Sequence, residues 1–363
     1  MKVPIVLGTR PEIIKMAPVI REFQRQIIGF FILHTGQHYS YRLDSIFFDE
    51  LELPEPKYNL DTGSGTHAEE TGRMLIGIEK VLLDEKPDVV LVEGDTNSVL
   101  AGALAAAKLN IKVGHIEAGL RSYDRSMPEE LNRIVADHVS DYLFAPTEKA
   151  KRTLVGEGIA EEKIIVTGNT IVDAVYQNLE MARSKSRALD KLGLKEQEYF
   201  LVTAHRQENV DVMDRLKAIF KGLGLVYQKY QLPLVYPVHP RTRRRIKEFG
   251  LEVATGIRLI KPVGFLDFLA LEANATLILT DSGGVQEESC ILNVPCVTLR
   301  DNTERPETLE VGSNVLAGSE PEIILSSVEK MLAKERNWSN PFGDGHAGSR
   351  IVKAISETCK TWE

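Results

Sequence analysis

The sequence contains little cysteine. Its three cysteines, Cys290, Cys296 and Cys359, form no C-x-x-C pair. No cluster of histidine and cysteine has the spacing of a zinc site. So few thiols, in an odd number, also argue against a disulfide framework and are typical of a reducing compartment. We therefore expect three small buried thiols and no bound metal.

Excess basic charge and long apolar runs are also lacking. Acidic residues outnumber basic ones by 52 to 44, and the formal net charge is −8. The dense basic segment "RTRRRIK" at 241–247 is interpreted as a solvated or anion-facing helix start, so no nucleic-acid partner is expected. No apolar run is long enough to span a bilayer, and "MKVPIVLGTRPE" lacks the pattern of a signal peptide. These absences predict a cytoplasmic protein without a membrane partner.

The sequence does contain a regular alternation of two kinds of segment. Short apolar runs such as "VPIVLG", "PDVVLVEGD" and "ATLILTDSGG" alternate with longer segments of helical spacing. Continuous apolar runs are typical of strands covered on both faces, and their alternation with helices indicates parallel, doubly wound sheets. We expect about six strands before residue 170 and about five after it. The predicted fold class is α/β, with two Rossmann-like domains and a cleft between them.

The length of the chain also favours two domains, because 363 residues exceed what one hydrophobic core usually supports. The composition changes near "TGNTIVDAV", which is followed by a polar stretch. The N-terminal domain is predicted to cover 1–169 together with a helix over 346–363 that returns to it. The C-terminal domain is predicted to cover 170–345.

Polar residues gather where the apolar runs end, which is the edge where open parallel sheets bind ligands. In "LGTRPEIIK", Arg10 lies at a helix start and Lys15 follows one turn later, so both can face an anion. In "LTDSGGVQEES", residues 282–284 can expose backbone N–H groups to a phosphate, and a carboxylate farther along that helix suits a ribose diol. The alternative for each segment is a plain βα turn.

Carboxylates follow two of the apolar runs. Asp95 ends "VVLVEGD", Glu117 ends "VGHIE", and Glu129 and Glu130 open the helix that comes next. The glutamate pair could stabilise its helix through a favourable interaction with the helix dipole, and Asp95 could cap a helix. Glu117 has no such structural role. Carboxylates held close together raise each other's pKa and can act as acid and base.

Histidines end two further runs. His205 lies in "TAHRQEN" beside Arg206, and His239 lies in "YPVHP". A histidine at a strand end can be purely structural, and Arg305 in "RDNTERPE" could lie in a solvated loop. Taken together, the strand ends predict acid–base chemistry on a phosphate-bearing polar metabolite, without a metal or a redox cofactor.

The motifs "GTRPEIIK", "TGQH", "GDTNS", "HIEAGLRS", "PEELNR", "TAHRQEN", "DSGGVQEE" and "RDNTERPE" occur in this order along nearly the whole chain. In this set and order, the sequence resembles the non-hydrolysing UDP-N-acetylglucosamine 2-epimerases. The resemblance implies a GT-B fold and reversible conversion of UDP-N-acetylglucosamine to UDP-N-acetylmannosamine without a cofactor. In that family, anti elimination of UDP yields 2-acetamidoglucal, and UDP then re-adds as a proton returns to the opposite face of C2.

The resemblance also implies roles for individual residues. Catalytic roles are implied for Asp95, Glu117, Glu129 and His205. The implied UDP-binding residues, with Glu288 at the ribose and Phe268 near the uracil, are Arg10, Lys15, Phe268, Ser282, Gly283, Gly284, Glu288 and Arg305. A second UDP-N-acetylglucosamine is implied as an allosteric activator, at Gln37, His38, Arg73, Glu130, Arg206 and His239. The family further suggests a homodimer.

One segment departs from the family pattern, and other functions remain open. Met127 precedes Pro128 where bacterial members usually carry an aromatic residue, which affects how the loop before it packs.

A hydrolysing epimerase would share the fold and the carboxylates but release free N-acetylmannosamine. A GT-B glycosyltransferase would need an acceptor, and a UDP-sugar sensor would not need both Asp95 and Glu117.

Overall fold

The computed structural model describes residues 1–36 and 47–360, without the side chains of 358–360. The predictions at Gln37 and His38, and the one on the thiol of Cys359, lie outside the described part. The chain separates into two compact units, Met1–Tyr176 with Phe342–Glu363 (unit 1) and Gln177–Pro341 (unit 2). The domain limits drawn from the sequence, and the cleft between the domains, remain predictions.

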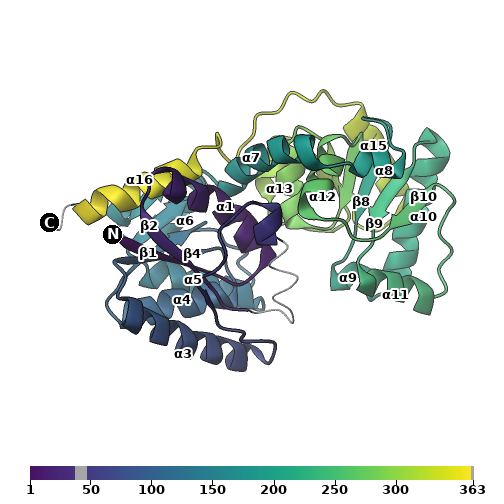
Figure 1. Ribbon diagram of the computed structural model, residues 1–363. Helices are drawn as coiled ribbons and strands as arrows, with labels where there is room; N and C mark the ends of the chain where they lie inside the picture. The colour runs from purple at the N-terminus through teal and green to yellow at the C-terminus, as the bar shows by residue number, and fades with distance from the viewer. Residues whose placement is uncertain (37–46, 361–363) are drawn as a thin grey trace. The chain divides into compact units, whose positions relative to one another are not determined.

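Unit 1 contains a seven-stranded parallel sheet in the order β3-β2-β1-β4-β5-β6-β7. Figure 1 labels three of these strands, β1, β2 and β4. Its strands are β1 (Lys2–Leu7), β2 (Gly29–His34), β3 (Tyr58–Asn59), β4 (Val89–Glu93), β5 (Lys112–Ile116), β6 (Tyr142–Ala145) and β7 (Ile164–Val166). The helices are α1 (Arg10–Arg25), α3 (His67–Glu85), α4 (Asn97–Lys108), α5 (Pro128–Val139), α6 (Glu148–Gly156), the 3-10 turn η1 (Glu161–Lys163), and α16 (Ala347–Lys360), while α7 (Thr170–Lys185) continues into unit 2.

Unit 2 contains a six-stranded parallel sheet in the order β10-β9-β8-β11-β12-β13. Its strands are β8 (Phe200–Thr203), β9 (Leu234–Pro237), β10 (Ile257–Ile260), β11 (Leu277–Thr280), β12 (Cys296–Thr298) and β13 (Asn314–Leu316). The helices are α8 (Ala188–Leu192), α9 (Gln207–Val210), α10 (Met213–Tyr230), α11 (Pro240–Glu248), α12 (Phe265–Ala273), α13 (Gly283–Ile291), α14 (Pro306–Glu310) and α15 (Pro321–Leu332).

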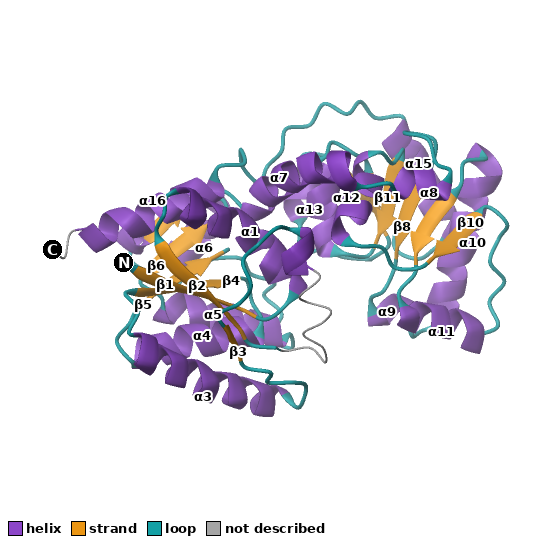
Figure 2. Ribbon diagram, viewed as in Figure 1, coloured by secondary structure: helices purple, strands orange, loops and turns teal. Residues whose placement is uncertain are grey.

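Helices flank the sheet within each unit (Figure 2). In unit 1, β4 is buried at every position, and the apolar sides of α3 and α4 pack on that sheet. In unit 2, α10 and α15 pack on one side, and α8, α12 and α13 contribute to a separate apolar cluster with the sheet. Strands covered on both faces carry continuous apolar runs, which is why these runs were readable in the sequence.

The strand order explains where the functional edge of each sheet lies. Counted within its own unit, each sheet begins with the order 3-2-1-4-5-6 of a doubly wound Rossmann fold. Neighbouring connections leave in opposite directions between β1 and β4 in unit 1, and between β8 and β11 in unit 2. Ligands bind beside such switch points, at the carboxyl ends of the strands. The predicted fold class of two Rossmann-like parallel sheets is thereby confirmed.

The last helix, α16, packs on α1 within unit 1. The close approach occurs at Gly348, where a Cβ atom would lie 3.1 Å from the backbone of Pro18. Asp173 on α7 accepts hydrogen bonds from the N–H groups of Ala347 and Gly348, which satisfies donors at the start of α16.

Among the described residues, no helical segment has both the length and the apolar character of a membrane-spanning helix.

Candidate functional site

The turn after β1 is organised by Glu12. Thr9 is the N-cap of α1, and Glu12 completes a capping box by accepting the N–H groups of Gly8 and Thr9, each at 2.7 Å. Thr96, the N-cap of α4, donates its hydroxyl to the same carboxyl group. Gly8 is needed because a Cβ atom there would overlap the hydroxyls of Thr35 and Ser98. Glu12 therefore ties the two loops at the switch point of unit 1 together.

Burial raises the pKa of Glu12 from 4.5 to about 7, although Thr96, Gly8 and Thr9 donate hydrogen bonds to it. The folded protein thus keeps a proton that the unfolded chain loses near pH 4.5, so stability falls as the pH rises from about 4.5 to 7. The stability lost over that range is on the order of 3 kcal/mol.

We expect Glu12→Gln to remove this loss, because glutamine stays neutral. Urea unfolding of both proteins between pH 4.5 and 8 should show the variant gaining stability relative to the wild type as the pH rises. The exposed Glu55→Gln is the matched control, since its side chain lies in water. A constant difference between Glu12→Gln and the wild type would contradict the prediction.

Lys15 lies between two buried carboxylates. Its ammonium forms an ion pair with Glu117 and lies 3.5 Å from the carboxylate of Glu93. The side chains of Glu93 and Glu117 are 2% and 3% exposed, so both carboxyl groups lie beside this cation in a setting of low polarity. Burial raises the pKa of Glu93 well above its ordinary value, and the charge of Lys15 opposes that rise. The ionisation of Glu93 at the end of β4 therefore depends on the charges of both Lys15 and Glu117.

Glu117 has an unusual backbone as well as a buried side chain. Its φ angle is +66°, in the left-handed region that residues other than glycine seldom adopt. Such a conformation stores strain, and strained residues cluster at functional sites. Glu117 therefore combines a strained backbone with a buried side chain that is paired with Lys15.

Asp95 is held by α5. Arg133 forms an ion pair with its carboxylate, and the Asn132 amide donates to its backbone carbonyl at 2.9 Å. Glu129 lies exposed in the first turn of α5, whereas Glu130 is buried. Glu130 accepts the N–H groups of residues 122 and 123 at 2.8 and 3.1 Å, so it orders the loop before α5. That loop ends at Met127, the residue predicted from the sequence to affect how the loop packs.

A buried histidine supports the same strand ends. The Nδ1 atom of His115 on β5 lies 2.7 Å from a carboxylate oxygen of Asp137. Its Nε2 atom lies 2.8 Å from the carbonyl oxygen of Gly94. Burial alone would raise the pKa of Asp137, but the charges of His115 and Arg121 lower it. This network fixes Gly94, the residue directly before Asp95.

In unit 2 the strand ends are organised by Asp281, which is fully buried after β11. It accepts the N–H groups of His205 and Arg206, each at 2.9 Å, and the side-chain amide of Asn209 at 3.1 Å. The ring of His205 lies 3.2 Å from the same carboxylate. Burial alone would raise the pKa of Asp281, but these donors lower it. His205 is thereby oriented while its side chain stays 48% exposed.

Several predicted residues line one cavity of about 240 Å³ in unit 2. Its wall is formed by the carboxyl ends of β8 and β9, by α12 and by the start of α13. The lining residues are Thr203, Ala204, His205, Pro237, His239, Pro262, Val263, Phe268, Ser282 and Val285. An aromatic ring, two histidines and a helix N-terminus around a partly apolar hollow are suited to a base carrying an anionic group.

The start of α13 leaves room around its two glycines. Ser282 is its N-cap, and a Cβ atom on Gly283 or Gly284 would meet nothing closer than 3.8 Å. Farther along this helix, the buried Glu287 pairs with Arg305 at 2.7 Å. The adjacent Glu288 is 9% exposed.

The remaining predicted residues lie as follows. Arg10 is exposed at the start of α1, with its guanidinium 5.0 Å from the centre of the Phe47 ring. Arg73 on α3 donates to the carbonyl of Ser64, and His239 is the N-cap of α11. Arg206 is the N-cap of the short helix α9.

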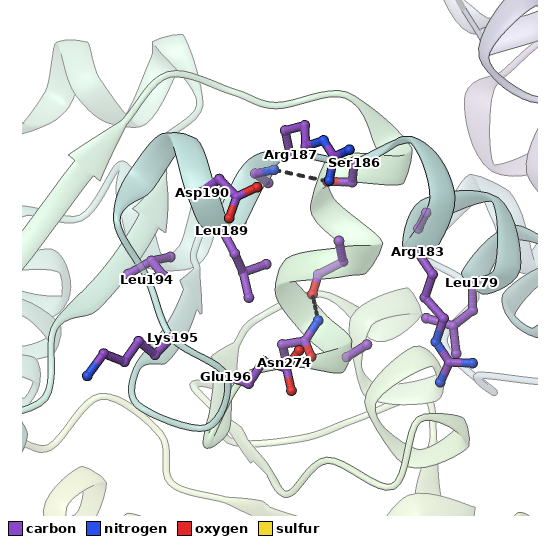
Figure 3. A pocket seen from close by; sticks show the side chains of 14 residues that line it. Leu179, Arg183, Ser186, Arg187, Leu189, Asp190, Leu194, Lys195, Glu196 and Asn274 are labelled. Carbon is purple, nitrogen blue, oxygen red and sulfur yellow. Dashed lines mark hydrogen bonds between the residues drawn. The ribbon is translucent and has the colours of Figure 1, made fainter.

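A second hollow in unit 2, of about 620 Å³, lies between the end of α7, α8 and α12 (Figure 3). Its wall mixes Arg183, Arg187 and Lys195 with Asp190 and Glu196. None of the residues predicted from the sequence lines it. Across the described part of the chain, no group of three or more histidine, cysteine, aspartate or glutamate residues could hold a metal ion.

Comparison with known proteins decides the family. Residues 21–356 match the family profile described as UDP-N-acetylglucosamine 2-epimerase. The chain is 59% identical over 362 residues to the UDP-N-acetylglucosamine 2-epimerase of Methanocaldococcus jannaschii, with 98% of this chain and 99% of that protein covered. The chain belongs to the UDP-N-acetylglucosamine 2-epimerase family.

Other members of the UDP-N-acetylglucosamine 2-epimerase family are also similar to nearly the whole chain. The enzyme of that name from Methanococcus maripaludis is 58% identical over 360 residues, covering 98% of each protein. A crystal structure of the Methanocaldococcus jannaschii UDP-GlcNAc 2-epimerase in complex with UDP-GlcNAc and UDP has a TM-score of 0.89 and 58% identity, and covers 98% of this chain and 100% of that one. The family predicted from the motifs is confirmed.

Sequence reasoning missed several residues that organise the site of this epimerase-family chain. Glu12 was readable as the fourth residue of a T-x-x-E capping box. Glu93 was readable as a charge inside an apolar run, which is rare unless the charge is paired. Arg133 and Asp281 carry no comparable signal, because their partners lie far away in the sequence.

Proposed function

We propose that this protein interconverts UDP-N-acetylglucosamine and UDP-N-acetylmannosamine without hydrolysing either. The observation that carries the proposal is the buried cluster of Glu117, Lys15 and Glu93, with Asp95 on the neighbouring strand end. Membership of the UDP-N-acetylglucosamine 2-epimerase family supplies the substrate class. Carboxylates held in place with a neighbouring cation suit removal and return of a proton.

The proposed reaction has two halves. In the first, a carboxylate takes the C2 proton, the C2–H electron pair forms a C1=C2 double bond, and the C1–O bond breaks with its electrons going to UDP. In the second, a proton is delivered to the opposite face of C2 and the UDP oxygen bonds to C1 again. The two faces of C2 need two different proton carriers, and we propose that both belong to the group Asp95, Glu117 and Glu129.

Unit 2 is proposed to hold the UDP. Glu288 would accept hydrogen bonds from the ribose hydroxyls, Phe268 would stack near the uracil, and residues 282–284 would face the diphosphate. His205, Arg10 and Arg305 would stabilise the negative charge that grows on UDP as it leaves. Lys15 is proposed to act through its pairing with Glu117, because the structure places its ammonium against that carboxylate.

The test is proton exchange at C2. The purified protein is incubated with UDP-N-acetylglucosamine in deuterated water, and C2 is followed by proton NMR. We expect loss of the C2 proton signal together with formation of UDP-N-acetylmannosamine. Accumulation of free N-acetylmannosamine and UDP would instead support a hydrolysing enzyme. Absence of exchange at all substrate concentrations would overturn the proposal.

Two further features are proposed with this function. One is allosteric activation by a second UDP-N-acetylglucosamine, involving Arg73, Glu130, Arg206 and His239 together with residues 37 and 38. The other is assembly as a homodimer. Steady-state rates in the UDP-N-acetylmannosamine direction, with and without added UDP-N-acetylglucosamine, test the first, and sedimentation equilibrium tests the second.

A further inference from the structure

A buried acid in unit 2 has no role in the reaction proposed above. Glu272 lies on α12 and is fully buried. Neither of its carboxyl oxygens accepts a hydrogen bond from the described residues. An isolated buried carboxylate is so costly that the group instead keeps a proton or shares one.

The position of Glu272 links it to the candidate nucleotide cavity. On α12 it follows Phe268 by four residues, so both side chains lie on the same face of that helix. On α13, Glu288 follows Val285 by three residues, which again places two side chains on one face. Phe268 and Val285 both line the cavity, and α12 packs against α13. Glu272 and Glu288 interact with each other, and each lies one helical turn away from a cavity-lining side chain.

In the described part of the chain, the charged groups around Glu272 do not include a base that could pair with its carboxyl group. Among the described residues, the titratable side chains that interact with Glu272 are Glu288, Tyr199, which directly precedes β8, and Cys296 on β12, and none of them is basic. A proton is thus the positive charge that can join the two carboxyl groups.

We propose that Glu272 is a positioning residue for the nucleotide: its protonated carboxyl donates a hydrogen bond to Glu288 and holds that carboxylate toward the ribose hydroxyls. This inference rests on the proposed role of Glu288 at the ribose. No proton is transferred on binding. Glu272 keeps its proton, and the remaining lone pairs of Glu288 accept from the ribose.

The electrostatics of the pair agree with this arrangement. Burial, and then the negative charge of Glu288, raise the pKa of Glu272 well above its ordinary value. The folded protein thus holds a proton that the unfolded chain releases near pH 4.5, so this pair costs stability as the pH rises above that value.

The first experiment measures ribose discrimination. Calorimetric titration gives the Kd of UDP and of 2′,3′-dideoxy-UDP for the full-length wild type, for Glu272→Gln and for Glu272→Met. Glutamine keeps a donor toward Glu288, whereas methionine fills a similar volume without one. We expect the wild type and Glu272→Gln to prefer UDP by roughly 100-fold, and Glu272→Met by roughly 10-fold or less.

A purely structural role would change the two affinities equally, so discrimination that Glu272→Met leaves intact would overturn the inference. It would also be overturned if Glu272→Gln lost discrimination as fully as Glu272→Met. The exposed Glu252→Met is the control for adding a methionine to unit 2, and it should behave as the wild type.

The second experiment does not depend on nucleotide binding. Unfolding free energies of the wild type and Glu272→Gln are compared between pH 5 and 8. The variant should gain stability relative to the wild type as the pH rises, and a constant difference would contradict the shared proton. If the wild type binds no UDP, the proposed function fails, whereas this comparison still decides whether Glu272 carries a proton.

Discussion

Glu117→Gln is expected to lower the rate of C2 proton exchange by about 10³-fold or more, because it removes the proposed proton carrier and leaves a neutral amide. The affinity for UDP should stay within about 3-fold, since Glu117 has no proposed contact with UDP. Folding should also be retained, because Lys15 keeps its second partner, Glu93. Exchange is followed by NMR in deuterated water, and UDP binding by calorimetry.

The control for this variant is Glu157→Gln. Glu157 pairs with Arg121 as Glu117 pairs with Lys15, but its side chain is 28% exposed and it has no proposed catalytic role. It should exchange the C2 proton at the wild-type rate. Normal epimerisation by Glu117→Gln would show that the proton carrier is another residue.

Lys15→Met is expected to have the second largest effect, a loss of about 100-fold in kcat at neutral pH. Without the ammonium, Glu93 and Glu117 form a buried pair of like charges, and one of them will bind a proton. Lys15 opposes the raised pKa of Glu93 in the wild type, so its removal shifts the titration of the pair to higher pH. Activity that needs an ionised Glu117 should therefore recover partly as the pH rises.

This prediction is tested by measuring kcat and kcat/KM from pH 6 to 9.5. Lys15→Arg, which keeps the charge, should restore part of the activity and the wild-type pH profile. Lys112→Met is the matched control, because Lys112 pairs with Asp141 while its side chain is 49% exposed. An unshifted pH profile in Lys15→Met would mean that Lys15 does not set the protonation of the pair.

The strands of this protein were largely readable because the sheets are covered on both faces. Runs such as "VVLVE" and "LILT" correspond to β4 and β11, and the polar residue after each run lies at the functional edge. Two strands were missed, β3 and β13, which have two and three residues and lie at sheet edges. Segments so short carry no periodic pattern, and only their pairing with a neighbour makes them strands.

The sequence by itself determined the alternation of strands and helices, the family, and the residues at the strand ends, because local patterns and motifs carry that information. The tertiary structure decided which of those residues share charges and protons. Glu12 meets Thr96, Asp95 meets Arg133, and Glu272 meets Glu288 only after folding. Burial and the proximity of charges set their protonation, and both depend on contacts between residues far apart in the chain.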